Sequence, residues 1–177
     1  EPTASTARAA REKGLNVIEE FFGGELADRL TVRGLAADLT VANNVLAHVP
    51  DMLDFLEGFR ILLKPQGVVT FEFPHLLQMI RESQFDTIYH EHISFFNVKS
   101  MRALAERAGL HLVDAIKTPI HGTSYIFVLS RKEQNQYRVD NILAMESRLH
   151  QGSTYRNWAD GVRKLLVDLK EQIDTYR

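Results

Sequence analysis

The chain has 177 residues, with 21 lysines and arginines against 23 aspartates and glutamates, and it contains no cysteine. Because the charges are nearly balanced and form no long run of one sign, neither nucleic acid nor an acidic membrane surface is expected as a partner. The absence of cysteine excludes disulfides, thiolate nucleophiles and cysteine-based zinc sites within these residues. No apolar run reaches the roughly 18 to 20 residues of a membrane span, so we expect a soluble, cytoplasmic chain.

The first half of the chain predicts helices and strands in alternation. Alanine-rich residues 3–14 predict a helix that ends at Gly14, residues 15–22 a short strand, and residues 24–31 a short helix. A strand of about five residues and a turn follow within residues 37–51. In residues 52–67, leucines and phenylalanines spaced three and four apart predict an amphipathic helix.

The second half continues this alternation and then becomes helical. Apolar residues 68–73 predict a buried strand, 74–83 a helix that starts at Pro74, and 98–110 a helix that Asn97 caps and Gly109 ends. Residues 111–132 predict two strands joined around positions 119–122. From residue 135 onward the pattern is polar and helical, with a break at 151–154.

Strands that alternate with helices predict an α/β fold, a mostly parallel sheet with helices on both faces. The last two strands have no helix between them, so the last one should be antiparallel. Ligands in such sheets gather at the carboxyl ends of the strands. The candidate residues at those ends are Glu1, Phe21, Phe22, Asn43, Asn44, Glu72, Phe73 and His121.

The segment DTIYHEHISFF, residues 86–96, places four polar side chains among apolar ones and permits three interpretations. If the segment is extended, His90 and His92 point to one side and could share a metal ion, with Glu91 on the other side. Alternatively, the polar groups satisfy loop backbone. In the third interpretation they transfer protons: a neutral histidine acts as base, a carboxylate orients it, and the Tyr89 hydroxyl donates to a developing oxyanion. In the first interpretation, a catalytic zinc would need a third protein ligand, which would be His48, His111 or His121.

Several runs in this order resemble one family over nearly the whole chain: EPTASTARAAREKGLNVIEEFF, ANNVLAHVPD, LLKPQGVVTFEFP, FDTIYHEHISFF and HGTSY. They resemble the sugar C-methyltransferases, which use S-adenosylmethionine to methylate a carbon of a nucleotide-linked keto deoxysugar. YHEH is the most specific element. The resemblance implies a Rossmann-like methyltransferase sheet, a sugar nucleotide as small-molecule substrate, and no metal in the reaction.

The resemblance also implies roles for individual residues. His92 would be the catalytic base, with Tyr89 and Glu91 beside it, while His90 would belong to the loop structure. Residues implied to bind the cofactor are Glu1 at the ribose, Phe21 and Phe22 at the adenine, and Asn43 and Asn44 at the methionine part. Residues implied to bind the sugar are His121 and Ser124. Thr123 and Ile126 depart from the family pattern, where a glycine and often an arginine stand.

By the same resemblance, we expect the chain to be the middle of a longer protein. Residues 1–133 would form a methyltransferase core without its amino-terminal strands and glycine-rich loop, and 134–177 a helical tail that leads to a carboxyl-terminal domain. By itself this chain should then bind the cofactor poorly, and a homodimer is a further expectation. Two alternatives stay open: a methyltransferase of another small molecule, including one directed to oxygen, and a non-catalytic fragment that binds a sugar nucleotide or a partner.

Overall fold

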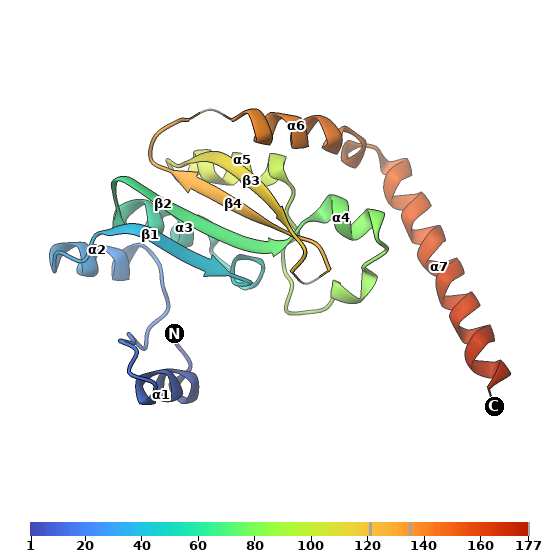
Figure 1. Ribbon diagram of the computed structural model, residues 1–177, viewed down its shortest axis with the longest axis horizontal. Helices are drawn as coiled ribbons and strands as arrows, with labels where there is room; N and C mark the ends of the chain where they lie inside the picture. The colour runs from blue at the N-terminus through green and yellow to red at the C-terminus, as the bar shows by residue number, and fades with distance from the viewer. Residues whose placement is uncertain (121, 135, 177) are drawn as a thin grey trace.

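The computed structural model describes residues 1–120, 122–134 and 136–176. Its four strands are β1 (Ala37–Asn43), β2 (Leu63–Pro74), β3 (His111–Thr118) and β4 (Ser124–Ser130). They form one sheet in the order β1-β2-β4-β3, in which β1 and β2 are parallel and β4 is antiparallel to both of its neighbours (Figure 1). β1, β2 and β3 therefore run in one direction, which confirms the predicted mostly parallel sheet with an antiparallel last strand.

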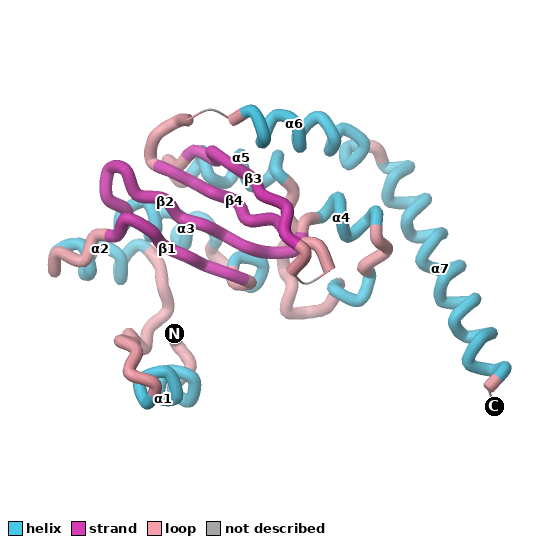
Figure 2. The backbone as a smooth tube through the Cα atoms, in the orientation of Figure 1, coloured by secondary structure: helices cyan, strands magenta, loops and turns pink. Residues whose placement is uncertain are grey.

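Seven helices and three short 3-10 turns are found in the described residues. The helices are α1 (Ala4–Glu12), α2 (Gly24–Val32), α3 (Met52–Leu62), α4 (Leu76–Arg81), α5 (Val98–Arg107), α6 (Tyr137–Met145) and α7 (Gly152–Thr175). The 3-10 turns are η1 (Leu46–His48), η2 (Phe85–Thr87) and η3 (Glu146–His150). Figure 2 shows the helices α1 and α7 lying away from the sheet at opposite ends of the molecule.

The hydrophobic core lies on one face of the sheet. Val69, Phe71 and Phe73 alternate along β2 toward this face, and Phe73 stacks on Phe127 of β4 with ring centroids 4.7 Å apart. Side chains of α3, α5 and α6 all join the same cluster of buried residues. On β1, Leu39 and Val41 are each 57% exposed.

The prediction of helices on both faces is wrong for the described residues, and the topology gives the reason. The connections from β1 to β2 and from β2 to β3 both advance in the same direction across the sheet. Crossovers between parallel strands are right-handed, so α3 and α5 must cover the same face. A second covered face needs connections that advance in the opposite direction.

Two local predictions are also wrong. Residues 15–22 form no strand, because no described strand pairs with them. Pro74 does not begin a helix but ends β2, where it pairs with Ser124. Its missing N–H and restricted φ suit the end of a strand as well as the start of a helix.

Other sequence signals lie where they were expected. Asn97 caps α5 by accepting a hydrogen bond from the Ser100 N–H at 2.7 Å, and the Ser100 hydroxyl completes a capping box by accepting from the Asn97 N–H at 3.0 Å. Gly109 follows α5 with φ +70°, in the left-handed region that favours glycine. Gly14 plays the same part after α1, with φ +82°.

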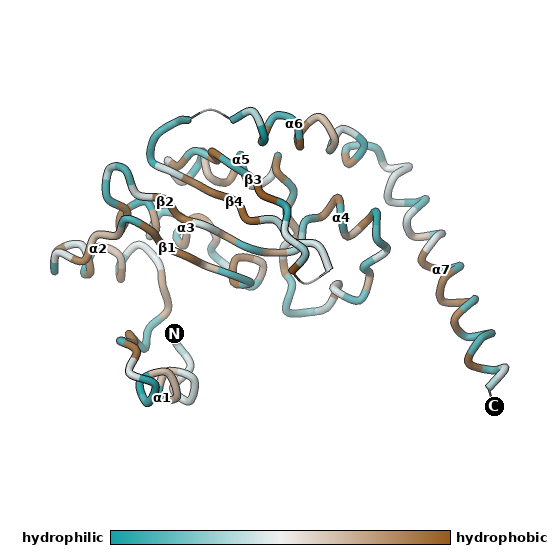
Figure 3. Tube along the Cα trace, in the orientation of Figure 1, coloured by the Kyte–Doolittle hydropathy of each residue, from teal (hydrophilic) through white to brown (hydrophobic). Residues whose placement is uncertain are grey.

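The long helix α7 begins at Gly152, so the predicted break before it falls at Gln151. Figure 3 shows hydrophobic positions along this helix where it projects from the rest of the molecule. Leu165, Leu169 and Ile173 are between 46% and 49% exposed. Over the described part of the chain, no helix combines the length and the apolar character needed to cross a membrane.

Candidate functional site

The carboxyl ends of β1 and β2 lie side by side and form the edge of the sheet where the candidate residues gather. Asn43 pairs with Glu72 in the parallel register. The next residue, Asn44, has φ 54°, and its N–H donates to the Glu72 carbonyl at 2.7 Å. Asparagine is one of the few residues that adopt this left-handed conformation at little cost. The turn sends the chain from β1 into η1 along the same edge.

The YHEH segment is a tight turn rather than the extended loop considered from the sequence. The His92 N–H donates to the Tyr89 carbonyl at 3.0 Å. This turn brings together two side chains three residues apart, with their ring centroids separated by 4.3 Å and the Tyr89 hydroxyl 3.2 Å from His92 Nε2. His90 and His92 therefore do not lie on one side of an extended segment. The side chain that His92 contacts within this turn is Tyr89.

The hydrogen bonds of His92 determine which ring nitrogen is available as a base. Nδ1 lies 2.7 Å from the Thr87 carbonyl oxygen. A carbonyl only accepts, so Nδ1 carries the hydrogen and the neutral ring has its lone pair on Nε2. The Tyr89 hydroxyl then donates to Nε2. The turn thus holds the histidine in the tautomer that a general base requires, with a phenol next to the basic nitrogen.

His48 belongs to this site, although the sequence reasoning named it only as a metal ligand candidate. Its ring centroid lies 4.8 Å from that of His92, and its Nδ1 is 2.8 Å from the Glu91 carbonyl oxygen. The Ile93 N–H donates to the Ala47 carbonyl at 3.1 Å, so η1 supports the turn at two points. The signal available from the sequence was the position of His48 just beyond the end of a strand.

A small pocket lies directly beside His92. Residues from the end of β2, from α4 and from the turn line it: Ala47, Phe73, Pro74, Met79, Thr87, His92, Ser94, Phe95 and Phe96. Most of these side chains are apolar, and His92 is half-buried among them.

Glu91 and His90 lie on the outside of the turn. Their side chains are 63% and 89% exposed, and the Glu91 carboxylate lies 3.8 Å from His90 Nε2. The contact that orients His92 is the Thr87 carbonyl, and the contribution of Glu91 to the site is its backbone carbonyl. Among the described residues, no group of three or more histidines, aspartates and glutamates is arranged to hold a metal ion.

The turn between β3 and β4 comes to the same edge of the sheet. Ser124 is fully buried and pairs with Pro74, which lines the pocket beside His92. Its hydroxyl has no hydrogen-bond partner within the described part of the chain. Thr123 is tied to the end of α4, with its hydroxyl 3.0 Å from a Glu82 carboxylate oxygen. His121, the other predicted sugar contact, lies outside the described residues.

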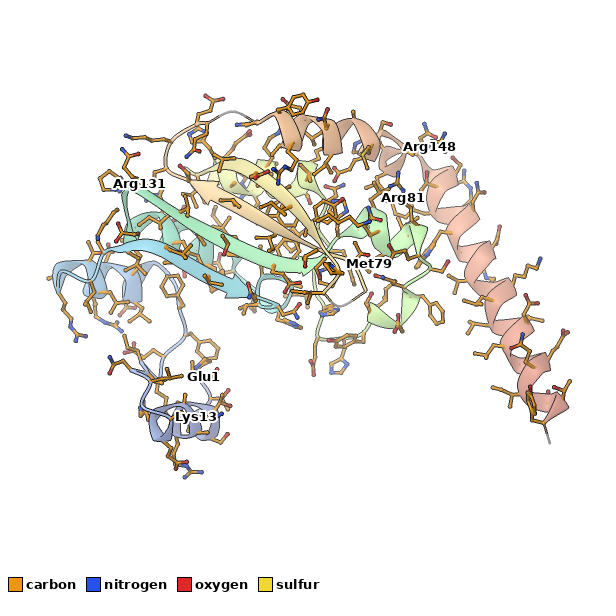
Figure 4. The ribbon with its side chains drawn as sticks, in the orientation of Figure 1. Glu1, Lys13, Met79, Arg81, Arg131 and Arg148 are labelled. Carbon is orange, nitrogen blue, oxygen red and sulfur yellow. The ribbon has the colours of Figure 1, made fainter. Side chains whose placement is uncertain are left out.

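The predicted cofactor residues divide into exposed and packed ones. Glu1 is exposed and accepts a hydrogen bond from the Thr3 N–H at 2.9 Å, which lowers the pKa of its carboxyl (Figure 4). Phe21 is 83% exposed. Phe22 instead packs on α3, with ring centroids 4.5 Å from Phe59 and 5.7 Å from Phe55. Asn43 and Asn44 are exposed at the edge described above.

Comparison with known proteins agrees with the α/β architecture. A family model described as a methyltransferase domain matches residues 4–115, more than half of the chain. The chain belongs to this methyltransferase-domain family. The matched residues include β1 and β2, which are the parallel pair of the four-stranded sheet.

One curated relative is a C-methyltransferase, NovU, of Streptomyces niveus. It is 31% identical over 178 aligned residues, which cover 98% of this chain and 42% of the relative. The chain therefore spans less than half the length of that protein.

Two solved structures share the fold. A SAM-dependent methyltransferase of Thermotoga maritima, described as a possible histamine N-methyltransferase, superposes with a TM-score of 0.53 at 19% identity over 75% of this chain and 71% of its own. TnmH superposes with a TM-score of 0.52 at 24% identity over 73% of this chain and 41% of its own. At these identities the likeness establishes the fold and not the reaction.

Proposed function

We propose that the chain is the core of a S-adenosylmethionine-dependent C-methyltransferase that acts on a nucleotide-linked keto deoxysugar. The observation that carries the proposal is the state of His92, whose Nδ1 is held by the Thr87 carbonyl so that Nε2 is free of hydrogen and stands beside the Tyr89 hydroxyl. The similarity to a C-methyltransferase over 98% of this chain supports the carbon-directed reaction.

A carbon becomes a nucleophile toward an electrophilic methyl group only after it loses a proton. In the proposed reaction, His92 Nε2 takes the proton from a carbon next to the ketone. The C–H bond breaks, an N–H bond forms, and the electron pair moves toward the ketone oxygen to give an enolate. The imidazolium that results keeps its hydrogen bond to the Thr87 carbonyl, which stabilises the positive charge.

Tyr89 has a second task in this proposal. Its hydroxyl donates to Nε2 in the structure; when it turns to the ketone oxygen of a bound substrate, it would release the Nε2 lone pair for the C–H proton and donate to the oxygen on which the enolate charge develops. A donor placed at a developing negative charge lowers the barrier of such reactions. His48 holds the turn in place through the Glu91 carbonyl, and Ser124 offers a buried hydroxyl near the same edge.

Four of the five predicted cofactor residues fit S-adenosylmethionine. The Glu1 carboxylate, with its lowered pKa, stays ionised and suits the hydroxyls of a ribose, and the exposed ring of Phe21 suits a flat base. Asn43 and Asn44 offer amides at the strand ends. Phe22 fits less well, since its ring packs on α3. The cofactor would supply a methyl group bound to a positively charged sulfur, and the residues of this chain would orient it.

The division of the chain is part of the same proposal. Residues 1–133 would be the methyltransferase core, and residues 134–177 the tail, whose described part consists of α6, η3 and α7. The apolar positions exposed along α7, such as Leu165 and Leu169, favour packing against a further domain.

The experiment that tests the proposed function follows a labelled methyl group. The intact protein is mixed with methyl-labelled S-adenosylmethionine and a thymidine-diphosphate 4-keto-6-deoxy sugar, and mass spectrometry and NMR locate the label. Label on a sugar carbon is the expected result. Label on a sugar oxygen would indicate the oxygen-directed alternative, and no transfer to this or related keto sugars would contradict the proposal.

A further inference from the structure

The structure contains a second pocket, of about 630 Å³, outside the candidate active site. It lies where α4, η3 and the start of α7 meet, and its polar lining includes Arg81, Ser83, Ser147, Arg148, Thr154 and Asn157, with Trp158 beside them. Figure 4 shows Arg81 on α4 and Arg148 close to the start of α7. Leu77 and Ile80 of α4 supply part of the apolar wall.

The pocket is lined by two arginines that form no ion pair within the described residues. Arg81 and Arg148 are the only charged residues in its described lining. The two closest carboxylates in sequence are engaged elsewhere. Glu82 contacts Thr123 and Gln84, and Glu146 is buried against α5. Two guanidinium groups without a counterion favour a ligand with two negative charges.

Trp158 contributes an aromatic ring to the wall of the same pocket. The flat ring offers a surface on which an aromatic base can stack.

We propose that this pocket binds a nucleoside diphosphate, with Arg81 and Arg148 on the phosphates and the base against Trp158. The proposal rests on the proposed function for the nature of the acceptor, which would carry such a nucleotide. α4 separates the two pockets, since Met79 lines the one beside His92 and Leu77 lines this one. The thickness of one helix is about 10 Å. The nucleotide is either the carrier of the acceptor sugar or a separate molecule.

Fluorescence can test this proposal directly, because Trp158 is the single tryptophan of the chain. The intact protein is titrated with thymidine diphosphate and with inorganic diphosphate, and Trp158→Phe gives the signal that does not come from this residue. The expected result is a saturable change in emission with thymidine diphosphate. Arg81→Gln and Arg148→Gln should each weaken binding at least tenfold.

Arg156→Gln is the matched control, since it removes the same charge from an exposed position of α7 that does not line the pocket. It should change the affinity less than twofold. A melting temperature equal to that of the wild type shows that each variant is folded. No saturable binding at millimolar thymidine diphosphate, or equal affinity in the arginine variants, would overturn the proposal.

The transfer assay separates this proposal from the proposed function. If KM for the acceptor rises in step with the loss of thymidine diphosphate affinity, the nucleotide is the carrier of the acceptor. If affinity falls and KM stays unchanged, the pocket binds a separate nucleotide. Binding without any methyl transfer would support the pocket and contradict the proposed function. Methyl transfer without nucleotide binding would support the proposed function and contradict the proposal for this pocket.

Discussion

Replacing Glu146 with alanine should destabilise the protein by several kcal/mol, although Glu146 lies far along the chain from the residues that it contacts. Its carboxylate accepts from the N–H groups of Val98 and Lys99, at 2.6 and 3.1 Å, and from His75 Nε2 at 2.8 Å. His75 and Glu146 are 0% and 1% exposed. One side chain therefore caps α5, supports the end of β2 and attaches η3 to both.

The magnitude follows from what the substitution leaves unpaired. Loss of a helix cap costs about 0.5–2 kcal/mol, and a buried polar group without its partner costs about 1–3 kcal/mol. Together the two losses amount to about 1.5–5 kcal/mol. We therefore expect the free energy of unfolding to fall by about 1.5–5 kcal/mol in Glu146→Ala. In Glu146→Gln the free energy of unfolding should fall less, because the amide oxygen can still accept a hydrogen bond from a backbone N–H of α5.

The assay is urea unfolding of the intact protein followed by circular dichroism. Glu106→Ala is the matched control: it removes an exposed carboxylate whose contact with Arg102 is 3.9 Å long. This substitution should lower the free energy of unfolding by less than about 0.5 kcal/mol, because an exposed ion pair on a helix contributes no more than that. A loss below about 1 kcal/mol for Glu146→Ala would refute the reasoning.

Three further predictions concern stability. Asn97→Ala should lower the free energy of unfolding by about 1 kcal/mol, because α5 loses its capping box, and an unchanged urea midpoint would contradict this. Gly109→Ala should cost about 1–2 kcal/mol, since alanine is strained at φ +70°; the same change at Gly161, inside α7 with open space around it, should stabilise or be neutral. Burial raises the pKa of Tyr125 from its ordinary 10.0. The stabilisation that the protonated hydroxyl gives the folded state is therefore complete below pH 10 and is lost as the pH rises through the raised pKa. Tyr125→Phe should therefore show a smaller loss of stability between neutral and strongly alkaline pH in a series of urea titrations.

The order of helices and strands could be predicted where the apolar periodicity agreed with the residues that begin or end a helix. The amphipathic pattern of α3, the cap at Asn97 and the glycine at position 109 all acted through local physics. Residues 15–22 show the limit of that reasoning. Apolar residues there have strand propensity, but a strand also needs a neighbouring edge to bond with, which no local pattern reveals.

The candidate site could be located from the sequence, but its geometry could not. YHEH was correctly placed at the carboxyl edge of the sheet, because long connections after a strand return there. The turn that joins Tyr89 to His92 depends on the hydrogen bond of one backbone N–H, and the tautomer of His92 depends on the Thr87 carbonyl. His48 reaches the site from a separate segment, 44 positions earlier in the numbering, so its part in the site required the fold.

The most direct test of the proposed base compares two histidines, two positions apart in the chain, in the methyl-transfer assay. His92→Asn removes the proposed base, and His90→Asn makes the same change at a side chain that is 89% exposed and outside the pocket. A positioned general base typically contributes about 10²–10⁴-fold to the rate. The transfer rate should therefore fall by that factor in His92→Asn and by less than about twofold in His90→Asn. Equal rates in the two variants would contradict the assignment of His92 as the base that makes the carbon nucleophile.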